Sequence, residues 1–113
     1  MKKLLVIASA IAVTSGVTFA NDELVKEGKK IFMTKKLGNC FACHDVNGEK
    51  VDGPGSFGPK LQYLSAWPKK ALYDKVYDPY TTNPISAMPA FGKNGVLSDK
   101  QINAVVAYLK TIK

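Results

Sequence analysis

The chain has 113 residues, the length of one small domain, and its 16 basic and 9 acidic residues give a formal net charge of +7. Every basic residue is Lys, so no Arg is present for bidentate contacts to bases or phosphates, and we expect no nucleic-acid partner. The 2 Cys residues lie too close together for a disulfide to constrain much of the unfolded chain. The Lys excess fits either a solvated surface or one that steers an acidic partner.

A secretory signal is predicted at the N-terminus. Two Lys residues follow the initiating Met, an apolar run covers residues 4–13, and small residues stand where a signal peptidase cleaves. The apolar run is short for a membrane span, although an uncleaved anchor is the alternative. We therefore predict export to the periplasm, a signal peptide over residues 1–20, no stable membrane span after cleavage, and one domain over residues 21–113.

The first helix of the mature chain is predicted to start at a cap formed by Asp22. Residues 35–38 would end it, with Gly38 in the left-handed conformation that often follows a helix. Gly28 lies within this helix and costs about 1 kcal/mol relative to Ala. That cost makes sense if another helix crosses closely at Gly28, although a merely tolerated glycine is the alternative. Apolar residues recur along the helix at roughly helical spacing: Leu24, Val25, Ile31 and Phe32.

Cys40-Phe41-Ala42-Cys43-His44 has the spacing C-x-x-C-H, the attachment pattern of a c-type haem. Two thiols so spaced can add to the two vinyl groups of a protoporphyrin, and His44 then lies where its imidazole can bind the iron. A redox dithiol would need a βαβ setting, and a zinc site would need more ligands than the 2 Cys and 1 His of this chain. We predict one covalently bound haem c per chain, which would also supply an apolar centre for a small core.

Two long loops and a short helix follow the motif. Residues 45–60 and 80–95 are rich in Gly, Pro and polar residues and are predicted to be loops. Between them, Trp67-Pro68 would open a short helix that buries Leu72 and Val76 and ends at Asp78.

The final helix is predicted to open with a capping box formed by Ser98 and Gln101. Its apolar stripe comprises Ile102, Val105, Val106, Leu109 and Ile112. Since no segment shows the alternation of a strand, we predict a small all-α domain whose long loops wrap a bound group.

The iron face opposite His44 needs a ligand or stays open. Because the chain has no other His, and a Lys would have to lose its proton, Met is the favoured residue type. Met33 lies on the first predicted helix, where it would fill core space. Met88 lies in the second long loop, and Pro89 biases its backbone toward an extended conformation. We predict Met88 as the second axial ligand; with an open site, the protein would instead be a ligand-binding or peroxidase-type haem protein.

Pro59 is a candidate partner of His44. A ligating His usually donates its other ring N–H to a nearby acceptor, and the Pro59 carbonyl lies in the loop after the motif. The alternative is that Pro59 only shapes a turn.

The order of helix, C-x-x-C-H, Gly-Pro loop, short helix, Met-Pro loop and amphipathic C-terminal helix resembles the class I cytochromes c. This resemblance covers essentially the whole mature chain and implies a class I fold, with three to five helices and long loops around one haem. It also implies that Gly28 and Phe32 pack against Tyr108 where the terminal helices cross.

The second half resembles SoxX, the monohaem subunit of the SoxAX complex of bacterial sulfur oxidation. The resemblance rests on residues 76–79, 83–84, 88–92 and 95–97, on the last helix, and on Gly38-Asn39 and Gly58-Pro59. It implies a SoxA-type partner, a SoxYZ-type carrier and a downstream electron acceptor. It further implies a non-catalytic electron-transfer subunit of an L-cysteine S-thiosulfotransferase that oxidises thiosulfate. A freestanding periplasmic electron shuttle is the alternative.

Overall fold

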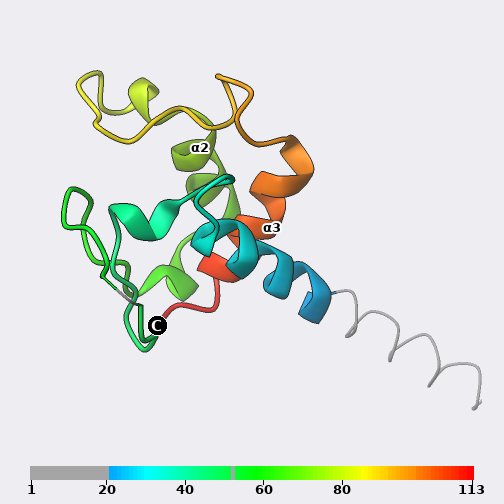
Figure 1. The fold of residues 1–113 in the computed structure, drawn as a ribbon. Coiled ribbons are helices and arrows are strands. Elements are labelled where there is room, and N and C mark those ends of the chain that lie inside the picture. Colours follow the sequence, from blue (N-terminus) through cyan, green and yellow to red (C-terminus); the bar gives the residue numbers. More distant parts are fainter. Residues whose placement is uncertain (1–20, 52) are drawn as a thin grey trace, which may run out of the picture.

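Helices and long loops make up the structure, a computed structural model that describes residues 21–51 and 53–113. Residues 21–33 are helical, and the two later α-helices are α2 (Lys69–Tyr77) and α3 (Asp99–Leu109) (Figure 1). Short 3₁₀ turns are η1 (Cys40–Ala42), η2 (Leu64–Ala66) and η3 (Pro79–Thr81). The described residues contain no strand, only an isolated bridge between Val46 and Leu61, so the predicted all-α class is confirmed. The predicted signal peptide lies outside the described residues.

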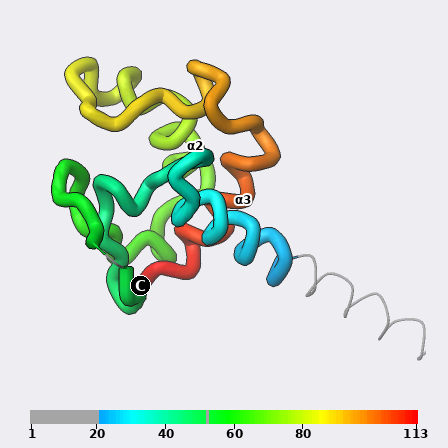
Figure 2. The backbone as a smooth tube through the Cα atoms, in the orientation of Figure 1, coloured from blue at the N-terminus to red at the C-terminus, as the bar shows by residue number. Residues whose placement is uncertain are grey.

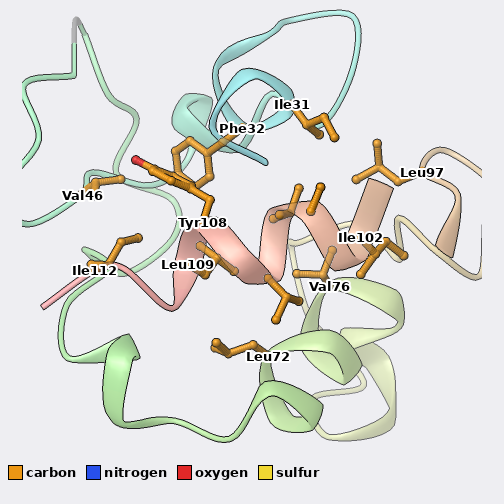
Figure 3. Close-up of a cluster of buried hydrophobic side chains, with 13 residues drawn as sticks. Ile31, Phe32, Val46, Leu72, Val76, Leu97, Ile102, Tyr108, Leu109 and Ile112 are labelled. Carbon is orange, nitrogen blue, oxygen red and sulfur yellow. The ribbon is translucent and has the colours of Figure 1, made fainter. Parts of the chain in front are cut away.

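The N-terminal helical segment and α3 cross at Gly28. A Cβ added at Gly28 would lie 1.9 Å from the carbonyl oxygen of Ala104 and 2.9 Å from the Cβ of Tyr108, so only glycine fits at this contact. One turn later, the rings of Phe32 and Tyr108 pack edge to face with their centroids 5.4 Å apart (Figure 3). The predicted crossing is therefore confirmed, and Gly28 is required there.

The helix α3 forms the centre of the core. Its N-terminus carries the predicted capping box, in which Gln101 N–H donates to Ser98 Oγ at 3.2 Å and Ser98 N–H donates to Gln101 Oε1 at 2.8 Å. The whole predicted stripe is buried, although its last member, Ile112, lies beyond the end of α3, and Leu72 and Val76 of α2 pack into the same cluster (Figure 3). Met33 is half-buried against this cluster, which confirms its predicted place in the core.

The boundaries of the first helix differ from the prediction. Residue 21 is already helical, so Asp22 is not its N-cap, and the helix ends at residue 33. The left-handed residue is Asn39, with φ 52°, and not Gly38. Gly38 is needed for space, because an added Cβ would lie 3.0 Å from the Cys40 Sγ and 3.1 Å from the Ile31 carbonyl oxygen.

Candidate haem-binding site

The C-x-x-C-H motif forms a single tight turn. Cys40 opens η1, and its carbonyl accepts hydrogen bonds from the N–H groups of Cys43 at 3.1 Å and His44 at 3.0 Å. This turn places both thiols and the imidazole within one short segment. Neither Cys is in a disulfide, so both sulfurs are available for thioether bonds.

The Cys40 thiol lies in a poorly hydrated place. Burial raises the pKa of Cys40 to about 12, and the nearby Cys43 adds to the rise while a backbone hydrogen bond opposes it. At neutral pH, free Cys40 would therefore be a protonated thiol. Since the thiolate is the nucleophilic form, Cys40 lacks the environment of a reactive cysteine.

The His44 ring is held by the loop that follows the motif. Its Nδ1 lies 2.8 Å from the Pro59 carbonyl oxygen, and this oxygen can only accept, so Nδ1 carries the proton. Gly58 packs on the ring, where an added Cβ would meet three of its atoms at under 3.0 Å. In the neutral ring, the tautomer that donates to Pro59 from Nδ1 carries its lone pair on Nε2, which is the atom that a metal would bind.

Gly55 is a site residue that the sequence interpretation missed. Its N–H donates to the Phe41 carbonyl at 3.2 Å, and an added Cβ would overlap the Ala42 carbonyl. The loop after the motif therefore folds back onto the motif and covers it. The run Gly53-Pro54-Gly55 was a usable signal, because adjacent Gly and Pro mark places where backbones turn and approach closely.

Met88 belongs to the loop over residues 80–95, which is separate from the segment over residues 40–44 that holds the Cys and His residues (Figure 2). Its side chain is half-buried and packs against the same core cluster as Cys40. Its backbone is fixed by Ser86, whose Oγ accepts from the Met88 N–H at 3.1 Å and lies 3.3 Å from the Met88 carbonyl oxygen. The structure thus gathers Cys40, Cys43, His44 and Pro59 at one place, and Met88 lies in the second loop with its side chain toward the core.

These residues fit a covalently held haem. Two free thiols and an imidazole held through its Nδ1 are the donor set that a haem c needs. Large apolar side chains also stand exposed on the two loops, with Phe57 86% and Ile85 91% exposed. Loops with such side chains suit a large apolar group bound among them.

The all-α fold and this donor set define a class I c-type cytochrome, whose covalent cofactor is haem c. The chain belongs to the family described as "Cytochrome C oxidase, cbb3-type, subunit III", whose profile matches residues 23–109. The chain is 35% identical over 91 residues, 76% of its own length, to an "Uncharacterized lipoprotein" of Aquifex aeolicus, and it spans 44% of the length of that relative.

A solved structure resembles this fold closely. A chain in the "Crystal structure of SoxXA from P. pantotrophus" superposes with a TM-score of 0.68 at 31% identity, covering 76% of this chain and 79% of that chain. Together with the family match, this similarity makes the protein a SoxX-like class I cytochrome and supports a role in electron transfer. Among residues 21–51 and 53–113, no helix is both long and apolar enough to cross a membrane.

Proposed function

We propose that this protein is the electron-transfer subunit of an exported, thiosulfate-oxidising SoxAX complex. It would accept electrons released when thiosulfate is coupled to a cysteine of a SoxYZ-type carrier, and pass them to a downstream acceptor. The observation that carries this proposal is the similarity to a chain of SoxXA at 31% identity over 76% of this chain. The sequence pieces shared with SoxX lie on both sides of Met88 and support the same assignment.

The proposed site residues have distinct roles. Cys40 and Cys43 would hold the haem through thioether bonds, and His44 and Met88 would bind its iron. When bound, the haem supplies one-electron chemistry. The hydrogen bond from His44 Nδ1 to Pro59 at 2.8 Å orients the imidazole and raises its basicity. The Met88 thioether, together with the imidazole, would favour the reduced iron and raise the reduction potential.

The same residues argue against catalysis of sulfur transfer by this chain. Covalent sulfur chemistry needs a reactive thiolate or persulfide. The 2 Cys residues of the chain are both assigned to thioethers, so no thiol remains for a sulfur adduct. If His44 and Met88 both bound the iron, substrate would have no place on it. The reaction centre would therefore lie in the SoxA-type partner.

Purification of the complex from the native organism tests this function. A tagged copy should bring down a larger haem protein in a fixed ratio, and deletion of the gene should abolish thiosulfate oxidation. Complementation with the parent gene should restore the activity, whereas a Cys40→Ala gene should not. Recovery of a monomer alone, with thiosulfate oxidation unchanged by the deletion, would refute the proposal. The gene neighbourhood gives an independent check, because a SoxX gene should stand beside one for a larger haem protein.

A freestanding shuttle is the second candidate, and the Lys-rich surface favours it. Several Lys side chains are exposed and form no ion pair with an acidic residue that the structure describes, as at Lys35 and Lys36 shortly before the haem motif. Such charges promote fast and transient docking to acidic redox partners. This candidate predicts electron exchange that slows steeply with salt and needs no stable complex.

A further inference from the structure

The loop that carries Met88 is closed at its base by the backbone. The Tyr77 carbonyl at the end of α2 accepts two hydrogen bonds, from the N–H groups of Gly92 and Lys93, each at 3.1 Å. Gly92 packs against the Tyr77 ring so closely that a Cβ has no room. The two ends of the loop, residues 78 and 92–93, are therefore held side by side.

Asp78 adds a charged tie at the same place. It is 9% exposed, and one oxygen of its carboxylate accepts from the Tyr80 N–H at 3.1 Å, which starts η3. The other oxygen lies 3.6 Å from the Nζ of Lys93, whose side chain is 66% exposed. The nearly buried carboxylate of Asp78 thus connects the first turn of the loop, at Tyr80, to its last residues, at Lys93.

Between these ends, the loop makes mostly short-range hydrogen bonds within its own backbone, and its side chains packed against the core are those of Met88 and Phe91. Ser86 hydrogen-bonds the Met88 backbone, and Lys75 of α2 donates to the hydroxyl of Thr82. Most side chains over residues 80–87 are exposed, so burial contributes little to holding this stretch. Since a poorly buried segment opens more readily than the core, the ties at the base determine how often it opens.

We propose that Asp78 is a positioning residue that closes the base of the Met88 loop and thereby sets how often Met88 leaves the iron. This inference rests on the proposed assignment of Met88 as an axial ligand. Removing the charge of Asp78 leaves Tyr80 N–H with a weaker acceptor and releases Lys93, while the backbone bonds to Tyr77 remain. The loop should then open locally without unfolding of the domain.

The test uses the haem-loaded ferric protein and two measurements. Cyanide displaces Met88 only after the loop opens, so the limiting rate of cyanide binding reports the opening. The charge-transfer absorption band of Met-ligated ferric haem reports the fraction of molecules in which Met88 is bound. Asp78→Asn should speed cyanide binding about tenfold or more and weaken the band, because a bond to a charged group is lost. Asp78→Glu should restore part of the parent behaviour.

Three further variants separate loop opening from general instability. Lys93→Gln removes only the exposed partner and should speed cyanide binding about two- to fivefold. Lys29→Gln breaks a comparable surface pair, with Glu49 at 3.2 Å, away from the loop, and should leave the rate unchanged. Ser98→Ala removes the cap of α3 and should lower the thermal midpoint while leaving the cyanide rate near that of the parent.

The outcomes distinguish this inference from the ligand assignment. A parent protein that lacks the band and binds cyanide as fast as Met88→Leu overturns the assignment of Met88, and with it this inference. A parent with the band, in which Asp78→Asn binds cyanide at the parent rate, overturns this inference alone. If Asp78→Asn does not load haem, Lys93→Gln decides: acceleration relative to Lys29→Gln supports the proposal, and equal rates overturn it.

Discussion

Replacing Gly28 by Ala should destabilise the protein, although Ala is the better helix former. The intrinsic gain from Gly to Ala in a helix is about 1 kcal/mol. Against this gain, the new Cβ would lie 1.9 Å from the Ala104 carbonyl oxygen and 2.9 Å from the Tyr108 Cβ. Neither is the end of a flexible side chain, so the two helices must move apart, and overpacking of this kind costs about 1–3 kcal/mol. Taking the upper part of that range, we expect a net loss of about 1–2 kcal/mol in the free energy of unfolding.

Thermal unfolding of the haem-loaded protein, followed by far-UV circular dichroism, measures this loss. The midpoint should fall by roughly 4–8 °C for each kcal/mol lost. Lys26→Ala is a matched control on an exposed position of the same helical segment and should change stability by less than about 0.5 kcal/mol. Ala104→Gly should not rescue Gly28→Ala, because the obstacle is the Ala104 carbonyl. An unchanged or raised midpoint of Gly28→Ala would refute the close crossing.

Three other variants test the cofactor site and the core. Met88→Leu should lower the reduction potential and let cyanide bind rapidly; an unchanged potential in redox titration would contradict Met88 ligation. Cys43→Ala should lower covalent haem content and the thermal midpoint, measured by absorbance after acid–acetone extraction; parental values of both would contradict the attachment role. Burial, and then the charge of Glu49, raises the pKa of Tyr108 to about 12. Because the fold favours the neutral phenol, the free energy of unfolding is unaffected by this group below pH 10 and falls as pH rises from 10 toward 12. Tyr108→Phe should therefore flatten the fall in stability over that range in urea titrations, and an unaltered slope would contradict the assignment.

The surroundings of the Tyr108 hydroxyl make Tyr108→Phe a clean test. Its oxygen is buried and has no hydrogen-bond partner among the described residues. Removing a buried polar group without a partner costs little, so Tyr108→Phe keeps the packing against Phe32 and changes mainly the titration. Tyr108→Phe therefore separates the effect of ionising the hydroxyl from the effect of the ring's packing.

The parts of the fold that the sequence predicted are those set by local patterns. The capping box at Ser98 and the apolar stripe of α3 lie within one helix, so periodicity and cap chemistry were enough to find them. The resemblance to class I cytochromes added the contact between Gly28 and Tyr108, which joins residues far apart in the chain. From the spacing alone, Gly28 could mark either a close helix crossing or a glycine that the helix merely tolerates.

The parts that the sequence did not predict depend on space and on exact backbone conformation. Gly38 was predicted to take the left-handed conformation after the helix, but Asn39 takes it instead. Gly38 is needed because a side chain there would collide with the Cys40 sulfur and the Ile31 carbonyl. Asn also tolerates the left-handed region, so composition could not decide between the two neighbours. The run Gly53-Pro54-Gly55 indicated a turn or a close approach, but it did not show that Gly55 contacts the motif, because a loop of this composition can follow many paths.

The two sides of the proposed iron site differ in how they are held, and this difference has a consequence for electron transfer. The His44 side is built from short-range contacts, since Pro59 and Gly58 belong to the loop that leaves the motif and bond directly to it. The Met88 side depends on a longer loop that is tied mainly at its base through Tyr77 and Asp78. Local opening should therefore release Met88 before His44. Any condition that weakens the base of this loop should lower the reduction potential while leaving the haem attached, because loss of the thioether destabilises the reduced iron.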